Sequence, residues 1–361
     1  MDLTFRRMAP EEALELRKLG RKSFGPLEAL FVSTPQTALV AVLDEKTVGG
    51  FVYQFETIGG KKVGFASFLF TDPAAHGQGI GKRLCEEGIR HLWEEGCDAL
   101  VTFVRDDNVA SWGLFKRNGF ALASLPKLVK LFGLPGLAKL FVKTTYGTFS
   151  IGHDFYVALR NKESTQSYTK EGGAGQVAAY VLINVLFLLF FMLRAAPNMH
   201  LFYAMAAGAV VLSGVVLAGY IGTLFSKREW RFRFTSGGGL VYLIINFAIG
   251  HFFPLIGNWY PLRYENTPRF RRDMAVNSIA VWVFLLGLIA ARIIAGGTMF
   301  LTYAAHIASF LLIYRLLPVA VFESSGFWRV FKWNKVVLGL LIAASIALVF
   351  VATRLHQVDY H

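Results

Sequence analysis

Cysteine is scarce in this chain of 361 residues, which contains two, Cys85 and Cys97. Neither has ligand-like neighbours, so the sequence excludes a disulfide framework and a cysteine-based zinc site. We expect a reducing compartment and no bound metal. An apolar core of signal-peptide length is not found in the first residues, MDLTFRRMAPEE. The first domain is therefore expected on the cytoplasmic side, where it is made.

Acidic residues are few, since 24 Asp and Glu stand against 37 Lys and Arg, giving a net charge of +13. Much of this excess lies beside apolar segments of the second half, where a positive-inside bias would put it. This distribution argues against nucleic acid as a partner. The basic residues concerned are Lys227, Arg228, Arg231, Arg233, Arg263, Arg269, Arg271, Arg272, Arg329, Lys332 and Lys335.

The composition changes near Glu171, with charged and alternating sequence before it and long apolar runs after it. The hydrophobic share of 54% and the mean hydropathy of +0.46 are therefore averages over two unlike parts. We predict a first domain at 1–163, a linker at 164–175 that is rich in Ser, Thr, Gln and Gly, and a transmembrane domain at 176–361.

The first part alternates strand and helix patterns, which predicts an α/β domain with a mixed sheet. In the expected helix at 80–95, Leu84, Ile89 and Leu92 share one face, so this helix should pack on the sheet. Strands are expected at residues 3–8, 38–43, 47–57, 62–70, 99–104, 120–123 and 154–160, and helices at 10–24, 80–95 and 110–117.

The second part contains apolar runs at about 176–194, 199–225, 238–257, 274–295, 299–322 and 336–353, each near the length that crosses a bilayer. They predict an all-α polytopic transmembrane domain of five to six segments, and hence an integral, multi-pass membrane protein. If every run spanned, the basic cluster at 263–272 would lie outside, against the bias. We therefore favour five spans and a re-entrant hairpin at 238–257.

The segment 125–142, LPKLVKLFGLPGLAKLFV, spaces Lys127, Lys130 and Lys139 between apolar residues at helical intervals. Such a basic amphipathic stretch suits the headgroup region of an anionic leaflet. Alternatively, its apolar face packs on its own domain or on the membrane domain. Both alternatives place it near the bilayer, so membrane lipids are expected partners.

A glycine-rich loop, HGQGIG at 76–81, connects an apolar strand to the helix at 80–95. Glycines let a backbone approach an anion closely, and successive N–H groups at a helix N-terminus supply hydrogen-bond donors and a favourable dipole. This pattern predicts a cradle for a pyrophosphate that needs no cationic side chain.

The loop and its flanks, FTDPAAHGQGIGK at 70–82, resemble the acyl-CoA loop of the GNAT acyltransferase superfamily. A second stretch, NVASWGLF at 108–115 followed by Gly119 and Phe120, resembles the later GNAT helix that packs along the pantetheine arm. The likeness covers about residues 1–160 and implies acetyl-CoA or another acyl-CoA as co-substrate. It assigns cofactor binding to Phe70, Thr71, His76, Gly77, Gln78, Gly79, Ile80, Gly81, Lys82, Asn108, Ser111 and Phe115.

Two positions depart from the family pattern. His76 replaces the usual Arg or Gln, and Phe115 stands where many members place a Tyr that protonates the departing thiolate, which a phenyl ring cannot do. The strand at 64–70 offers no carboxylate to act as base, so Glu56 and His153 are the catalytic candidates. Transfer by proximity, with water carrying the protons, is the alternative.

The membrane part contains several short stretches that carry a resemblance to a known family, at residues 229–232, 237–239, 272–279, 317–318, 323 and 331–334. With them it resembles the site-2 protease family of intramembrane metalloproteases. The zinc motif of that family, His-Glu-x-x-His, is replaced here by AGYIG at 218–222, so we expect neither a metal site nor protease activity. Glu323 stands for the family's aspartate, while His251 and His306 lack a second ligand at helical spacing. The resemblance implies a pseudoprotease scaffold.

Together these features predict a membrane-anchored, acyl-CoA-dependent N-acyltransferase, with acetyl as the expected acyl group, that acts on a membrane-associated amine at the cytoplasmic face. A lipid amine, a lipid-linked sugar and a protein are the candidate acceptors. The alternative is a non-catalytic acyl-CoA-sensing module, fused to a pseudoprotease domain that binds a membrane protein or lipid.

Overall fold

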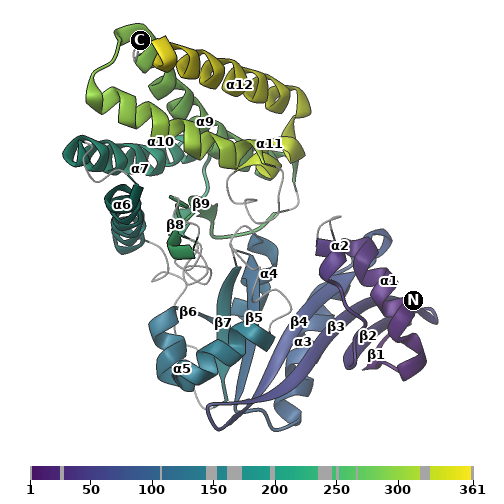
Figure 1. The fold of residues 1–361 in the computed structure, drawn as a ribbon. Coiled ribbons are helices and arrows are strands. Elements are labelled where there is room, and N and C mark those ends of the chain that lie inside the picture. The colour runs from purple at the N-terminus through teal and green to yellow at the C-terminus, as the bar shows by residue number, and fades with distance from the viewer. Residues whose placement is uncertain are drawn as a thin grey trace. The chain divides into compact units, whose positions relative to one another are not determined.

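The computed structural model divides into two compact units, Met1–Tyr168 and Thr169–His361 (Figure 1). The structure describes residues 2–24, 28–105, 108–143, 153–160, 173–195, 200–234, 246–248, 252–265, 267–317 and 326–358. The linker expected at 164–175 lies almost entirely outside these residues.

The first unit is built on a seven-stranded sheet with the strand order β1-β2-β3-β4-β5-β7-β6. Neighbouring strands run antiparallel except β4 and β5, which run parallel. The predicted α/β domain with a mixed sheet is therefore confirmed. The strands are β1 Leu3–Arg7, β2 Ala38–Leu43, β3 Lys46–Ile58, β4 Lys61–Thr71, β5 Ala99–Arg105, β6 Ala121–Ala123 and β7 His153–Leu159.

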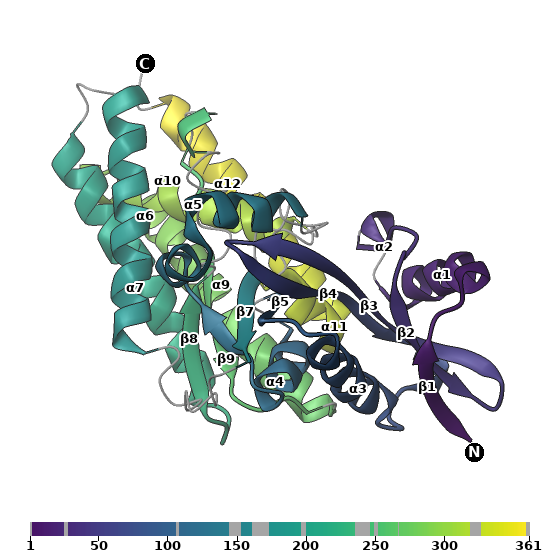
Figure 2. The same ribbon diagram turned by 90° about the horizontal axis from the view of Figure 1, so that it is seen from below.

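Helices cover both faces of this sheet, with α3 and α4 on one face and α5 on the other (Figure 2). The expected single helix at 10–24 is a 3-10 turn, Pro10–Glu12, followed by α1, and the short α2 has no counterpart in the sequence prediction. Pro10 stands at the start of that turn. Its ring fixes φ near the helical value, and its missing N–H costs nothing there because the first N–H of a helix has no partner within the helix. The helices are α1 Ala13–Ser23, α2 Glu28–Phe31, α3 Ile80–Glu94, α4 Val109–Arg117 and α5 Leu125–Lys143.

The basic segment 125–142 forms α5, which packs on its own domain. Gly133, with φ 72° and ψ 170°, bends it in the middle. Leu128, Phe132 and Leu140 are buried in a core that also contains Phe65 of β4 and Val101 of β5. The sequence left open whether the apolar face of this segment meets lipid headgroups or a protein domain. In the structure it packs on the first domain.

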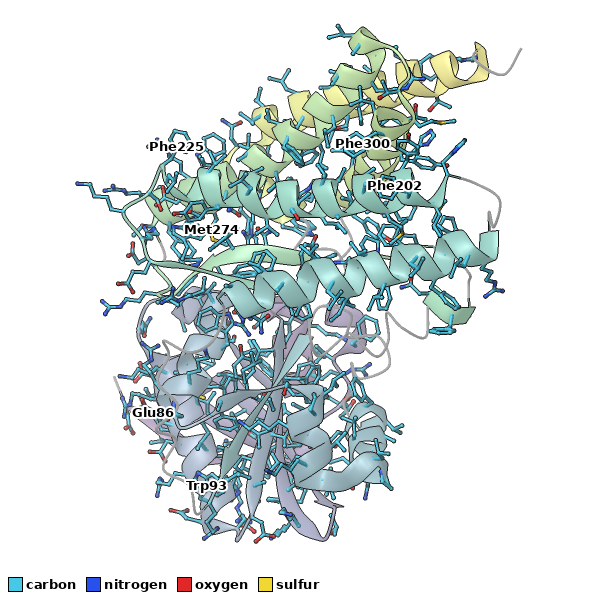
Figure 3. The ribbon with its side chains drawn as sticks, turned by 90° about the vertical axis from the view of Figure 1, so that its left-hand side faces the viewer. Glu86, Trp93, Phe202, Phe225, Met274 and Phe300 are labelled. Carbon is cyan, nitrogen blue, oxygen red and sulfur yellow. The ribbon has the colours of Figure 1, made fainter. Side chains whose placement is uncertain are left out.

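The second unit is helical, and five of its helices are long and apolar enough to cross a membrane. Their outer surfaces are apolar: Phe202 and Phe225, labelled in Figure 3, are 78% and 72% exposed. Exposing such large apolar surfaces to water is unfavourable, so they suit a lipid environment. The elements are α6 Ala174–Ala195, α7 Leu201–Thr223, β8 Trp230–Phe234, β9 Gly257–Pro261, α9 Pro268–Ala295, α10 Met299–Leu316, α11 Phe327–Trp333 and α12 Lys335–Val358.

Strand β8 pairs antiparallel with β9, and Phe234 is the partner of Gly257. Much of the apolar run at 238–257 lies outside the described residues, so the choice between a crossing segment and a re-entrant hairpin stays a prediction. Residues 235–245 and 249–251, which include His251, lie outside the described residues.

Two arginines that the sequence places among the membrane-flanking cations are in fact buried. Arg233 and Arg329 are 4% and 6% exposed. Arg329 lies on α11, where it donates hydrogen bonds to the Asn277 side chain and to the Trp259 carbonyl. The positive-inside rule considers position along the chain only, so it does not indicate which of these cations folding buries against polar partners.

Contact between α3 and β3 gives a stability test. An added methyl group at Gly88 would lie 2.5 Å from Cγ of Phe51, whose side chain is fully buried. We expect Gly88→Ala to destabilise the first unit by about 1–3 kcal/mol, because overpacking outweighs the gain in helix propensity. Gly113→Ala on α4 is the control, since no atom lies within 4 Å of its added methyl. Denaturant unfolding of the full chain measures both; a Gly88→Ala protein as stable as Gly113→Ala would contradict this packing.

Candidate functional site

Strands β4 and β5 separate partway along their length. Their parallel ladder runs from the pair Val63 and Ala99 to the pair Ala66 and Thr102, and then stops. Both strands continue, β4 to Thr71 and β5 to Arg105. The backbone edges beyond Thr102 therefore diverge, which leaves a V-shaped opening in the middle of the sheet.

Two local features mark the point of separation. The register of β3 against β4 shifts there, because Val52 pairs with Phe68 while Tyr53 pairs with Ala66, so Ser67 is an extra residue in β4. Such a bulge increases the local twist and bends the strand. The buried Thr102 hydroxyl donates a 3.0 Å hydrogen bond to the Ala66 carbonyl, at the last pair of the ladder between β4 and β5.

Thr102 is a residue of the site that was not predicted from the sequence, although the sequence marks it by its polarity. It is the one polar residue in the apolar stretch ALVTFV at 99–104. A buried hydroxyl in such a strand requires a hydrogen-bond partner, and that partner is the last paired carbonyl of β4.

The glycine loop follows directly from the free end of β4. Gly77 and Gly79 have φ of 87° and 74°, in the left-handed region that glycine enters without strain, and Gly79 caps the N-terminus of α3. In the described part of the chain, the backbone N–H groups of residues 77–82 donate no hydrogen bond to protein atoms. An exposed turn with free amides at a helix N-terminus is an anion-binding arrangement.

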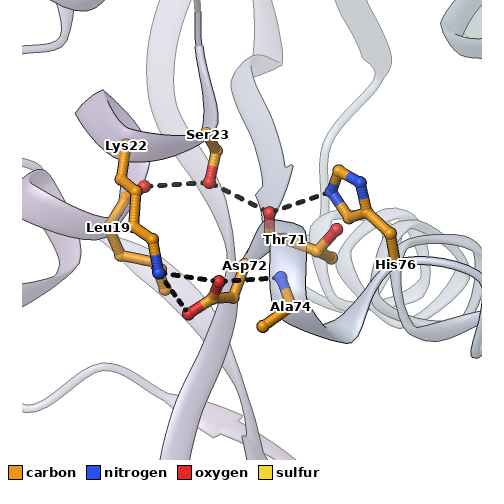
Figure 4. A network of polar contacts seen from close by, with 7 residues as sticks. All are labelled: Leu19, Lys22, Ser23, Thr71, Asp72, Ala74 and His76. Atoms are coloured by element: carbon orange, nitrogen blue, oxygen red, sulfur yellow. Dashed lines mark hydrogen bonds and ion pairs between the residues drawn. The ribbon is translucent and has the colours of Figure 1, made fainter.

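The base of this loop is tied to α1 (Figure 4). Lys22 Nζ lies 3.0 Å from Asp72 Oδ1, which also accepts a hydrogen bond from the Ala74 amide. The Ala74 amide and then the Lys22 ammonium lower the pKa of the Asp72 carboxyl. Ser23 Oγ donates to the Thr71 carbonyl at 2.9 Å, so the end of β4 is held as well.

The residues predicted to bind cofactor in this loop play different parts. The Phe70 and Ile80 side chains are buried in the domain core, so only their backbones border the loop. The His76 ring lies 3.3 Å from the Thr71 carbonyl, and Lys82 is exposed, with Glu86 at 3.8 Å. The loop's own amides, at Gly77, Gln78, Gly79 and Gly81, therefore supply most of its binding capacity.

The second signature forms α4 and the turn before it. Asn108 Oδ1 caps this helix by accepting a hydrogen bond from the Ser111 amide at 3.1 Å. Phe115 is buried, and its ring meets Phe120 edge-on with centroids 5.2 Å apart. This side chain is a core residue that offers no proton.

The two catalytic candidates lie at different places on the sheet. Glu56 pairs across β3 and β4 with Val63, on the closed side of the split, whereas His153 pairs with Arg105 at the open end of β5. Glu56 forms ion pairs with Lys143 at 2.8 Å and Lys139 at 3.1 Å of α5, and these lysines lower the pKa of its carboxyl, Lys143 most strongly. At neutral pH Glu56 is thus a paired carboxylate and a weak base.

In the second unit, residues 218–222, which the site-2 protease resemblance aligns with a zinc motif, lie on α7, where they contact another helix. Gly222 packs against α9, since an added methyl there would lie 2.7 Å from Cα of Asn277, and the Asn277 side chain donates to the Gly219 carbonyl. The described residues contain no group of three or more His, Cys, Asp and Glu that could hold a metal ion. The His306 side chain is exposed on α10. Glu323 and residues 237–239 lie outside the described part.

Comparison with known proteins agrees with this geometry. The family model described as the acetyltransferase (GNAT) family matches residues 7–120, which is less than half of the chain. A mycothiol acetyltransferase of Saccharomonospora viridis is 36% identical over 62 residues, which cover 17% of this chain and 20% of that protein. One from Saccharopolyspora erythraea is 32% identical over 87 residues, covering 24% and 28%. The match thus spans a minor part of these relatives.

Among solved structures, a GNAT family acetyltransferase from Brucella melitensis, in complex with acetyl-CoA, is similar at 24% identity and a TM-score of 0.29. The alignment covers 33% of this chain and 83% of that one. On the family match, the first unit of this protein contains an acetyltransferase domain of the GNAT family.

Proposed function

We propose that the protein transfers an acetyl group from acetyl-CoA to the amine of a membrane-associated acceptor. The observation that carries this proposal is the opening between β4 and β5, which leads to a loop of free amides at residues 77–82. An extended edge followed at once by an anion cradle suits a ligand with a chain of amides at one end and a pyrophosphate at the other. Acetyl-CoA has that chemistry, and the matched relatives are named acetyltransferases.

In this proposal the pyrophosphate accepts hydrogen bonds from the amides of residues 77–82. The pantetheine arm lies along residues 67–71 of β4 and takes up backbone groups that β5 no longer reaches. The thioester then lies near Ser67 and Thr102, where the strands part. An acceptor amine attacks the thioester carbon, the C–N bond forms as the C–S bond breaks, and CoA leaves as the thiol after the amine loses a proton.

The proposed base is chosen from the backbone positions of the two candidates. His153 stands opposite Arg105 at the open end of β5, whereas the carboxylate of Glu56 is held by two lysines on the closed side. We therefore assign the base to His153 and a structural part to Glu56. The buried Phe115 offers no proton, so the thiolate takes its proton from the amine or from water.

The acceptor is proposed from the second unit. Five helices suited to crossing a membrane support an integral membrane protein. In this proposal the first unit lies on the cytoplasmic side and residues 238–257 form a re-entrant hairpin. A bilayer concentrates amphiphilic amines, so a lipid amine, a lipid-linked sugar or a membrane protein is the proposed acceptor class. The site-2-protease-like fold, without protease activity, would serve there as a scaffold.

One observation favours a second candidate, an acyl-CoA sensor without turnover. Phe115 replaces a proton donor by a buried phenyl ring, so binding can persist where catalysis is lost. Both candidates require the same cradle, and turnover alone distinguishes them.

Turnover is tested with the full chain in lipid nanodiscs, acetyl-CoA, and an extract of whole membranes, with both its lipids and its proteins, as the source of acceptors. We expect thiol release that depends on the extract and disappears when its primary amines are blocked with a reactive ester. Absence of release, with acetyl-CoA binding intact by calorimetry, would support the sensor and reject the enzyme.

The cradle is tested by Gly79→Asp. The added carboxylate would face the pyrophosphate and repel it. We expect at least a tenfold loss of acetyl-CoA affinity, which corresponds to about the free energy of one hydrogen bond to a charged group. Gly60→Asp is the matched control, because Gly60 has the same φ of 74° as Gly79 and open space around it, but lies in the β3–β4 turn. Equal affinities of the two variants in calorimetry would refute the placement of the pyrophosphate.

The base assignment is tested by His153→Ala and Glu56→Gln. We expect His153→Ala to lower kcat by about 10²–10⁴-fold, the usual contribution of a general base, with little change in the KM for acetyl-CoA. Glu56→Gln should keep kcat and lose only the ion pairs with α5, worth about 0–1 kcal/mol of stability. Initial rates at saturating acetyl-CoA decide the matter, and the opposite pattern would assign the base to Glu56.

A further inference from the structure

The second unit has a polar cavity of about 280 Å³ beside the end of α7. Its walls come from the segment between α7 and β8 and from the end of β9 with the residues after it. These two stretches are joined where the Leu262 amide donates a 3.0 Å hydrogen bond to the Glu229 carbonyl. The volume is close to the lower end of the range for small-molecule sites, about 300 Å³, so it suits a small polar group. The lining residues are Lys227, Arg228, Glu229, Pro261, Leu262, Arg263 and Glu265.

Some of the charged groups in this cavity neutralise one another. Arg228 forms ion pairs with Glu265 at 2.6 Å and with Asp273 of α9 at 2.8 Å. Three other charged residues of the lining are exposed and form no ion pair among the described residues, namely Lys227, Arg263 and Glu229. The charge left unpaired in the cavity is thus two cations against one carboxylate, which favours an anionic ligand.

An apolar stripe leads along α7 to this cavity. Leu217, Ile221 and Leu224 are exposed and are spaced four and three residues apart, so they share one face of a helix that is long and apolar enough to cross a membrane. We call these three residues the α7 stripe. Lys227 follows the last of them by three residues. An apolar stripe that ends at a cationic cavity suits an amphiphile with an anionic headgroup.

The surface around the cavity carries further positive charge. Helix α9 begins at this end of the unit, because Asp273 in its second turn contacts Arg228, and Figure 3 shows Phe225 and Met274 toward the same end. An exposed aromatic residue beside cations is typical of the boundary between bilayer and water, where cations attract phosphate headgroups. The first turns of α9 bear three exposed arginines, Arg269, Arg271 and Arg272.

We propose that this cavity binds the phosphate group of an anionic phospholipid. Lys227 and Arg263 would donate hydrogen bonds to the phosphate oxygens, and the acyl chains would lie outside the cavity along the α7 stripe. Glu229 would repel the phosphate and so weaken its binding. The site lies in the second unit alone, so it stands whether or not the first unit transfers acetyl groups.

The test uses the full chain in a neutral detergent and measures binding by native mass spectrometry. The probes are dioctanoyl phosphatidylglycerol, dioctanoyl glycerol, which lacks the phosphate, and inorganic phosphate, which lacks the chains. We expect saturable binding of phosphatidylglycerol alone among the two lipids. Inorganic phosphate should bind at least about tenfold more weakly than the phospholipid, because it makes no contact with the α7 stripe. Equal affinity for inorganic phosphate, or equal binding of dioctanoyl glycerol, would overturn the proposal.

Lys227→Gln, Arg263→Gln and Glu229→Gln test the residues, with Arg271→Gln as control. Arg271 is exposed and lies two residues before Asp273, on the opposite side of α9 from the contact with Arg228, so its loss removes one charge at the same end without touching the cavity. We expect each of the first two variants to lower the affinity for phosphatidylglycerol about two- to fivefold, as the loss of an exposed ion pair implies. Glu229→Gln should raise it, and Arg271→Gln should leave it unchanged.

These variants separate a binding site from diffuse attraction by the whole cationic end. Diffuse attraction would weaken Arg271→Gln as much as Lys227→Gln and Arg263→Gln, and that result would overturn the proposal. Weaker binding by Glu229→Gln would overturn it as well, because removing a carboxylate from a phosphate site strengthens the site. All four side chains are exposed, so we expect unchanged Tm values that show intact folding.

Discussion

The separation of β4 from β5 beyond Ala66 and Thr102 is the constraint on which the first unit depends. Diverging strands leave backbone donors and acceptors without partners, which costs free energy unless something limits the split. The Thr102 hydroxyl limits it by satisfying the Ala66 carbonyl, and the extra residue Ser67 redirects the strand. Because the loop at residues 76–81 follows the same strand, the open edge and the anion cradle form one continuous surface.

Much of this site could be predicted from the sequence, because its chemistry lies in local backbone conformation. Gly77 and Gly79 adopt the positive φ that their residue type suggests, and α3 begins where the amphipathic pattern begins. The supporting contacts could not be predicted. Lys22 and Asp72 are fifty residues apart and meet only through tertiary packing, as do Thr102 and Ala66. For the contact of Thr102, the sequence shows only that a polar residue interrupts an apolar strand.

The segment α5 shows how composition alone leaves alternatives open. Its lysines and leucines at helical intervals suit a lipid headgroup region and a protein surface equally well. In the structure, Leu128, Phe132 and Leu140 join the core of the first unit, while Lys139 and Lys143 neutralise Glu56. The same contact therefore buries the apolar face of α5 and holds the Glu56 carboxylate in two ion pairs, which no sequence pattern could indicate.

Arg329 of the second unit is a case in which the charge pattern of the sequence and the burial in the structure differ. Arg329 follows an apolar run, so charge counting places it at a membrane surface, yet folding buries it against Asn277 and Trp259. Its Nη1 donates to both of these partners, whereas its Nε and Nη2 meet no acceptor among the described residues. Removing one member of such a buried set leaves the other polar groups unpaired, which costs more than the hydrogen bonds themselves contribute. The sequence could not indicate this arrangement, because Asn277 and Trp259 lie 52 and 70 residues before Arg329 along the chain.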